Sequence, residues 1–281
     1  MRWRWDTGAT IESRSASDQP FAGNVTYTSR SSHRAGGFDG LAFLAHVQTT
    51  YDPSVTSTPD SAPTRITLIR HGESNVTVQR VIGGFRTCTG LSDLGRRQAA
   101  RLAARVEETR ELDVDVLLTS SFRRAIETAD ILRPAFNIAN VETPWPEFGE
   151  HDPGPDIDGM TFAGYVERFG TPDWAADPDL EIFPGGETTA EFHARVAGAL
   201  SRLLVSYPGQ HVAVACHGGV VDAVFRTVVG VAATGGFILH TLNTSLSEFV
   251  APVEPAESWR VVRYNDAAHL AGLPESTERS D

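Results

Sequence analysis

The stretch Ile66-Thr67-Leu68-Ile69-Arg70-His71-Gly72 decides the fold. Its first four residues are apolar or β-branched, which is typical of a buried strand, and Gly72 marks the end of that strand. The pattern places an arginine and a histidine together at the carboxyl edge of a strand, where open α/β sheets bind their ligands. Much later, the apolar run Val212-Ala213-Val214-Ala215 leads into Cys216-His217-Gly218-Gly219. Two strand-ending histidines, each followed by glycine, indicate one site built from both.

Strand and helix signals alternate between residues 65 and 266. Ser92 is placed to cap one helix, Ser120 or Ser121 a second, and a capping box of Thr188 and Glu191 a third. The remaining signals predict strands over 114–119 and 211–216, a helix from about residue 220, and two closing strands over 247–251 and 259–263, antiparallel at one edge. This alternation predicts an α/β fold, a three-layer α/β/α sandwich on a mostly parallel sheet.

Residues 1–63 differ in composition from the rest of the chain. They are rich in Ser, Thr, Gly and Asp, and their apolar cluster at 41–47 could be a short helix or a docking segment. The stretch 49–63 is rich in Ser, Thr and Pro, which is typical of a linker. We therefore expect a poorly ordered N-terminal extension and linker over 1–63, a folded domain over 64–266, and a flexible C-terminal tail over 267–281.

Composition argues against several function classes. The formal net charge of −12 disfavours nucleic-acid binding, which needs a basic surface. All 24 basic residues are arginine, so the sequence offers no lysine for a P-loop, a Schiff base or a Ser-x-x-Lys pair. The two cysteines are too few for a disulfide framework. The sequence shows no signal-peptide pattern and no membrane-length apolar run, so we expect a cytoplasmic protein without membrane contact.

A metal-free phosphoryl-transfer site needs a nucleophile, cations around the phosphate oxygens and an acid for the leaving oxygen. The chain offers such groups at strand ends and in a first helical turn: His71 after the first strand, Arg124 after the second and His217 after a third. The Gly- and Pro-rich loop 150–154 suits a mobile acid. A metal-dependent hydrolase built on the two histidines is the weaker interpretation, because two arginines would repel a metal cation.

Five motifs, in this order, resemble those of the histidine phosphatase superfamily, also called phosphoglycerate mutase-like. The resemblance covers about residues 65–265 and implies the phosphoglycerate mutase-like version of the α/β/α sandwich. It rests on Arg70-His71-Gly72, on Gly90-Leu91-Ser92-Asp93-Leu94-Gly95, on Thr119-Ser120-Ser121-Phe122-Arg123-Arg124-Ala125-Ile126-Glu127-Thr128-Ala129, on Pro184-Gly185-Gly186-Glu187-Thr188 and on Cys216-His217-Gly218-Gly219.

The resemblance also implies roles for individual residues. His71 is the expected nucleophile and becomes phosphohistidine, while Arg70, Arg124 and His217 bind the phosphate. Glu150 is expected to protonate the leaving oxygen and then to activate water. Physical chemistry agrees with the first assignment, because an unprotonated imidazole is a nucleophile and nearby guanidiniums lower its pKa.

Two of these assignments have competitors. Arg123 adjoins Arg124, but the family's arginine directly precedes the alanine of its motif, which favours Arg124. The family's acid stands three residues before an aromatic-glycine pair. Counting back from Phe148-Gly149 gives Trp145, which cannot transfer a proton, whereas counting back from Pro153-Gly154 gives Glu150. We favour the second register; the substitutes are Glu147 and then Asp152.

The loop after the nucleophile departs from the family pattern. The family often has an asparagine six residues after the nucleophile, where this chain has Thr77, while Asn75 is only four residues away. Either side chain could donate a hydrogen bond to the phosphate. Farther along, we expect Arg86 and Gly90 of the loop 81–90 to line the substrate.

The function that the resemblance implies is a metal-independent phosphomonoester hydrolase with no cofactor. Two alternatives stay open: phosphoglycerate mutase-type phosphoryl transfer, and a catalytically silent module that binds phospho-ligands. Hydrolysis is favoured over the mutase because no extended insertion follows the acid motif. The expected substrate is a small phosphorylated metabolite or a phosphoprotein, and the sequence indicates neither which one nor the oligomeric state.

Overall fold

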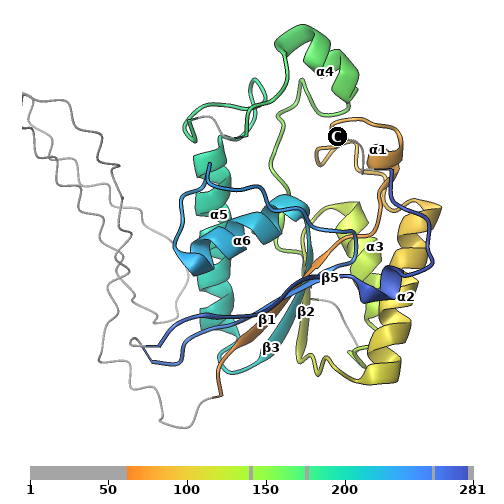
Figure 1. Cartoon of the computed structure of the whole chain (residues 1–281), viewed down its shortest axis with the longest axis vertical. Helices are drawn as coiled ribbons and strands as arrows, with labels where there is room; N and C mark the ends of the chain where they lie inside the picture. Colours follow the sequence, from red (N-terminus) through yellow and green to blue (C-terminus); the bar gives the residue numbers. More distant parts are fainter. Residues whose placement is uncertain (1–61, 139–141, 175–176, 255–256, 278–281) are drawn as a thin grey trace, which may run out of the picture. The chain divides into compact units, whose positions relative to one another are not determined.

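In the computed structural model, residues 62–138, 142–174, 177–254 and 257–277 are described. The predicted N-terminal extension and linker, with its apolar cluster at 41–47, lies outside these residues apart from positions 62 and 63. The described residues hold one five-stranded sheet with helices on both of its faces (Figure 1).

The sheet has the strand order β2-β3-β1-β4-β5. Its strands are β1 (Arg65–Arg70), β2 (Val116–Thr119), β3 (His211–Cys216), β4 (Leu246–Val250) and β5 (Arg260–Asp266). β1 and β2 each pair with β3 in parallel, β4 runs antiparallel to β1, and β5 antiparallel to β4. Only β4 therefore runs against the direction of the others, which confirms the mostly parallel sheet and the antiparallel closing strands.

Helices cover the two faces of the sheet, as the three-layer prediction requires (Figure 1). On one face, α5 (Thr189–Ser206) and α6 (Gly218–Val229) pack on Ile66 and Leu68 of β1. On the other face, α2 (Asp93–Thr109) and α3 (Arg123–Leu132) pack around Ile69. Alternate side chains of β1 therefore pack into the cores on opposite faces of the sheet, as expected from the two-residue period of a strand.

The helix starts follow the predictions in part. Ser92 accepts a hydrogen bond from the backbone N–H of Gly95 and caps α2, and the capping box of Thr188 and Glu191 opens α5. The predicted serine cap of α3 is wrong, because Phe122 occupies the cap position and no side chain caps this helix. α6 begins at Gly218, two residues before the predicted start. The short elements are α1 (Asn75–Val78), α4 (Phe162–Phe169), η1 (Pro146–Phe148) and η2 (Ala268–Leu270).

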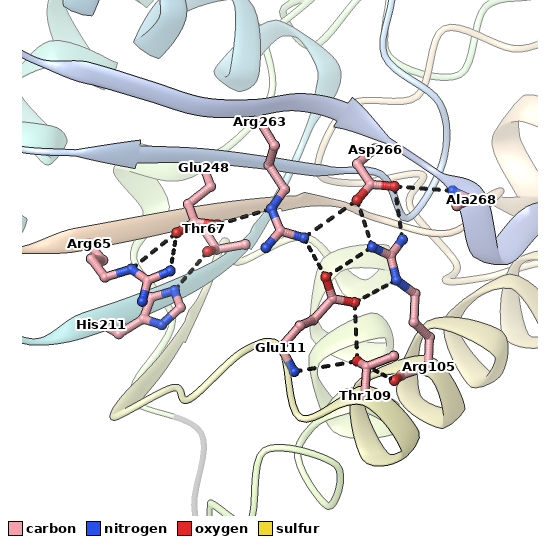
Figure 2. Close-up of polar contacts among 10 residues, drawn as sticks. All are labelled: Arg65, Thr67, Arg105, Thr109, Glu111, His211, Glu248, Arg263, Asp266 and Ala268. Carbon is pink, nitrogen blue, oxygen red and sulfur yellow. Dashed lines mark hydrogen bonds and ion pairs between the residues drawn. The ribbon is translucent and has the colours of Figure 1, made fainter.

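A network of charged side chains lies beside the antiparallel edge of the sheet (Figure 2). At its centre, Glu248 on β4 is fully buried and accepts hydrogen bonds from Arg65 and, at 3.0 Å, from Arg263 of β5. The same Arg263 donates to Glu111 at 2.8 Å. Arg105 on α2 donates to Glu111 and to Asp266 at the end of β5. The network thus ties α2 to β4 and β5 through guanidinium–carboxylate hydrogen bonds.

The chain beyond β5 makes specific contacts where the sequence predicts a flexible tail. His269 of η2 is buried, and its Nε2 lies 2.8 Å from the hydroxyl of Thr244. Ser276 and Thr277 donate hydrogen bonds to the carboxylate of Glu73, which follows His71 by two residues. Among the described helices, none is both long and apolar enough to cross a membrane.

Candidate active site

The register of the sheet brings the two strand-ending histidines together. Arg70 of β1 pairs with Cys216 of β3, and the next residues along the two strands are His71 and His217. The backbone N–H of His71 donates to the carbonyl of Cys216 at 2.9 Å. The two imidazole rings lie 5.1 Å apart between centroids and meet edge to face. Histidines separated by 146 positions therefore share one site, as the sequence predicts.

Arg124 joins the two imidazoles from the first turn of α3. Its Nε–H points at both rings, at 3.0 Å from Nε2 of His71 and 3.3 Å from Nδ1 of His217. The guanidinium lies over the ring of Phe122, and the side chain is almost fully buried. Its competitor Arg123 is exposed and pairs with Glu127 on the surface of α3. The structure thus places Arg124, and not Arg123, in the cluster.

The hydrogen bonds of each imidazole fix the position of its proton. Nδ1 of His71 lies 2.7 Å from the carbonyl oxygen of Gly72, which can only accept, so Nδ1 carries the proton and Nε2 keeps a lone pair. Nδ1 of His217 accepts from Arg124, so its Nε2 carries the proton and donates to the hydroxyl of Ser120 at 2.7 Å. Both lone pairs therefore face the guanidinium of Arg124.

Burial and neighbouring cations keep both histidines neutral. Burial lowers the pKa of His71 well below its usual value, and the guanidiniums of Arg124 and Arg70 lower it further. Burial likewise lowers the pKa of His217 well below 6.5, with Arg124 and then His71 as the next largest causes. An unprotonated imidazole is the form that can attack an electrophile, so the site holds its histidines ready for nucleophilic chemistry.

Arg70 is the second guanidinium of the site. Its side chain is mostly buried and donates to the backbone carbonyl of Thr241, in the loop before β4. The same loop supports the backbone of the motif, because Thr244 donates from its N–H to the carbonyl of Arg70 and the amide of Asn243 donates to that of His71. A loop about 170 residues away in sequence thus positions the pair Arg70 and His71.

Glu150 lies at the N-terminal end of α6, just beyond His217. One carboxylate oxygen accepts from the backbone N–H of Gly219 at 3.2 Å, and the other from the N–H of His151 at 3.1 Å. A Cβ on Gly219 would come within 2.3 Å of this carboxylate, so only glycine permits the approach. The first turn of a helix favours a negative charge. Glu150 also lines a cavity of about 790 Å³ together with Gly218 and Gly219.

The substitutes for Glu150 have other partners. Glu147 pairs with Arg202 of α5 at 3.1 Å. The Asp152 carboxylate accepts from the backbone N–H of Gly154 within its own loop, and Asp152 is exposed. Of the three carboxylates, Glu150 is the one that contacts the α6 terminus beside His217.

The four remaining predicted residues make their contacts away from the histidine pair. The Asn75 amide donates to Thr89, and the Thr77 hydroxyl pairs with Ser74 at the start of α1. Arg86 is largely exposed and donates to the carbonyls of Pro155 and Asp158. Gly90 is buried against Glu127 with a φ of +105°. None of these contacts reaches the imidazoles or the two guanidiniums.

Sequence reasoning missed Ser120 and Phe122 as site residues. Ser120 directly follows β2, and its hydroxyl forms a hydrogen bond with the imidazole of His217. The Phe122 ring lies edge to face on the same imidazole, with 4.8 Å between the ring centroids. The available signal was the strand-end position of Ser120, the same kind of position that marks the two histidines. The missing knowledge was that β2 lies next to β3, which the alternation of elements does not show.

Cys216 is unsuited to catalysis, because burial raises the pKa of its thiol. Within the described ranges, no group of three or more His, Cys, Asp or Glu side chains is arranged to hold a metal ion.

Comparison with known proteins finds relatives of this chain in sequence and in fold. Residues 66–267 match the model of the histidine phosphatase superfamily, branch 1. The uncharacterized phosphatase PhoE of Bacillus subtilis is 29% identical over 211 residues, which are 75% of this chain and 98% of that protein. The metal-independent phosphoserine phosphatase of Arabidopsis thaliana is 27% identical over 221 residues, 76% of this chain and 86% of its own. The solved alpha-ribazole phosphatase of Shigella flexneri shares the fold, with a TM-score of 0.61 at 22% identity, over 72% of this chain and 96% of its own.

Proposed function

The chain belongs to the histidine phosphatase superfamily, and from this membership we propose that it hydrolyses phosphomonoesters without a metal through a phosphohistidine on His71. The observation that carries the proposal is the Nε–H of Arg124 shared between two neutral imidazoles. A guanidinium held between two lone pairs is poised for a stronger, anionic acceptor. A phosphate dianion provides one, because charge-assisted hydrogen bonds exceed neutral ones.

Binding of the phosphate group prepares the nucleophile. As Arg124 turns its donors to the phosphate oxygens, Nε2 of His71 loses its hydrogen bond and its lone pair becomes free for attack. The proton on Nδ1 stays with the carbonyl of Gly72, so the ring keeps its orientation. Arg70 adds a second positive charge, and both guanidiniums offset the charge on the transferring oxygens.

The proposed reaction then runs in two steps. Nε2 of His71 attacks phosphorus in line with the ester oxygen, the P–N bond forms and the P–O bond breaks, and the carboxyl group of Glu150 protonates the departing alkoxide. Water next attacks the phosphohistidine while the Glu150 carboxylate accepts its proton. The P–N bond breaks, inorganic phosphate leaves, and Nε2 recovers its lone pair.

His217 contributes through its neutral Nδ1, which faces the phosphate position. A bound dianion favours protonation of this ring, and the imidazolium then donates from Nδ1 to a phosphate oxygen. Ser120 holds the ring by accepting from Nε2–H in both states. The substrate class that we propose is a small phosphorylated metabolite.

The test compares wild type with His71→Ala, and uses His240→Ala, an exposed histidine outside the cluster, as control. With EDTA present, we expect wild type and control to release phosphate from 4-nitrophenyl phosphate, and a covalent phosphate to be trapped on His71. His71→Ala should lose turnover by roughly a thousandfold or more while it still binds vanadate.

Three outcomes would contradict the proposal. Equal turnover in His71→Ala and wild type would exclude His71 as the nucleophile. Vanadate binding by a wild type that releases no phosphate would instead support a silent phospho-ligand module. Transfer of the phosphoryl group to a second phosphoglycerate in preference to water would support the mutase.

A further inference from the structure

The cavity of about 790 Å³ adjoins the proposed active site, because Glu150 and the first residues of α6 are part of its lining. Glu150, Gly218 and Gly219 line it, and so does Gly83, whose carbonyl accepts from Arg124. The alcohol portion of a substrate whose phosphate binds between the histidines would therefore occupy this cavity. The following inference rests on the function proposed above and concerns that alcohol portion.

Aromatic and aliphatic side chains make up much of the rest of the cavity lining. They include Trp174, Phe183, Phe192, Phe237 and Ile238. Trp174 leaves 48% of its surface exposed and Ile238 leaves 93% exposed, although both face a pocket. Large apolar groups held open at one concave site mark a surface that binds an apolar ligand.

The charged side chains of the wall are Arg226 and three carboxylates, those of Glu150, Asp173 and Asp222. Arg226 is the one arginine among the described lining residues, and it donates to Asp222 at 2.8 Å and to three backbone carbonyls. His193 lies near the same carboxylate, and burial, then Arg226, lowers its pKa to about 4, so it is neutral at pH 7. The wall therefore offers no ready cation for a carboxylate or second phosphate on the alcohol portion.

His151 supplies hydrogen-bonding capacity inside this apolar wall. It is about nine-tenths buried, and neither ring nitrogen has a hydrogen-bond partner within the described residues. Its ring contacts Trp174, Phe183 and Phe192 edge to face or tilted. Burial lowers the pKa of His151, so the neutral ring has one donor and one acceptor nitrogen to offer. Buried polar groups are normally satisfied. Both nitrogens are closed to solvent by the surrounding rings, so a ligand would satisfy this group by displacing part of that aromatic cover.

We propose that the preferred substrate is the phosphomonoester of a bulky, uncharged alcohol that carries an aromatic or similarly apolar ring and hydrogen-bonds to His151. Such an alcohol fills the cavity without burying an unpaired charge. Short alcohols make no contact with the aromatic side chains, and an alcohol with a carboxylate finds the Arg226 guanidinium already paired with Asp222.

The test uses esters of matched reactivity: ethyl phosphate, 4-methylbenzyl phosphate and 4-carboxybenzyl phosphate. We expect kcat/KM for the 4-methylbenzyl ester to exceed that for the ethyl ester by roughly a hundredfold, and that for the carboxylate by roughly tenfold or more. Equal values for all three esters would overturn the inference while phosphatase activity stands. Release of phosphate from none of them would count against the proposed function itself.

Two variants locate the preference in the cavity. Trp174→Ala should reduce the ratio of the 4-methylbenzyl to the ethyl ester several-fold, while Phe162→Ala, an aromatic residue of the same 48% exposure on α4, should keep it. Ile238→Arg introduces a cation at an exposed position and should raise kcat/KM for the 4-carboxybenzyl ester several-fold. Unchanged ratios in both cavity variants would show that the preference arises elsewhere and would refute the assignment.

Discussion

Replacing Ser120 with alanine tests how strongly the site depends on the orientation of His217. The hydroxyl accepts from Nε2–H of His217 at 2.7 Å and from the backbone N–H of Phe122 at 3.3 Å. His217 is fully buried, so water cannot replace the lost acceptor. An unsatisfied buried N–H costs about 1–3 kcal/mol. If that cost falls on the transition state, kcat/KM drops roughly 5- to 150-fold.

Steady-state phosphate release from one ester, with competitive inhibition by inorganic phosphate, measures this effect. We expect kcat/KM to fall by the stated factor and the inhibition constant for phosphate to rise. Ser121→Ala is the matched control, because Ser121 is the neighbouring serine and is only half-buried, and it should keep kcat/KM within about twofold. A folded Ser120→Ala enzyme with wild-type kcat/KM would refute the orienting role of Ser120.

Three further predictions concern stability. Burial lowers the pKa of His193 and of His269 to about 4, so the unfolded state binds protons at a higher pH than the folded state does. The free energy of unfolding should therefore fall as the pH drops from 6.5 to about 4. Urea denaturation at a series of pH values measures this free energy, and a value independent of pH would contradict the prediction. Glu248→Gln should destabilise the fold by about 1.5 kcal/mol, because the partly exposed Arg65 and Arg263 lose a charged acceptor and keep only a neutral one, whereas the exposed control Glu107→Gln should stay within about 0.5 kcal/mol. Thr188→Ala should lower the midpoint of thermal unfolding, because the loss of the helix cap costs about 1 kcal/mol. An unchanged midpoint would show that the capping box does not stabilise α5.

The layered fold was predictable because its strands and helices carry local signals. The apolar runs of β1 and β3, the serine that caps α2 and the capping box of α5 all lie within a few residues of the feature that they specify. The start of α3 was mispredicted for a nonlocal reason. Ser120 has the chemistry of a cap, but its hydroxyl bonds His217 from another strand, and Phe122 takes the cap position.

The site was predictable where strand ends determine it. His71 and His217 come together because their strands are neighbours in register. The predicted contacts of Arg86 and Asn75 depended on the shape of loops, and those loops direct the side chains to Asp158 and Thr89 instead. The alternation of elements could not reveal the support that Thr241 gives to Arg70, because a contact 171 positions apart depends on the whole chain path.

The direction of β5 has a practical consequence for handling the protein. Because β5 runs parallel to β1, it brings the chain to the edge of the sheet where Arg70 and His71 stand, and Thr277 donates a hydrogen bond there to Glu73. The chain enters β1 at Arg65, at the opposite edge. A group attached at Thr277 would therefore stand beside the loop that follows His71, whereas one attached at Arg65 would stand at the far end of the same strand.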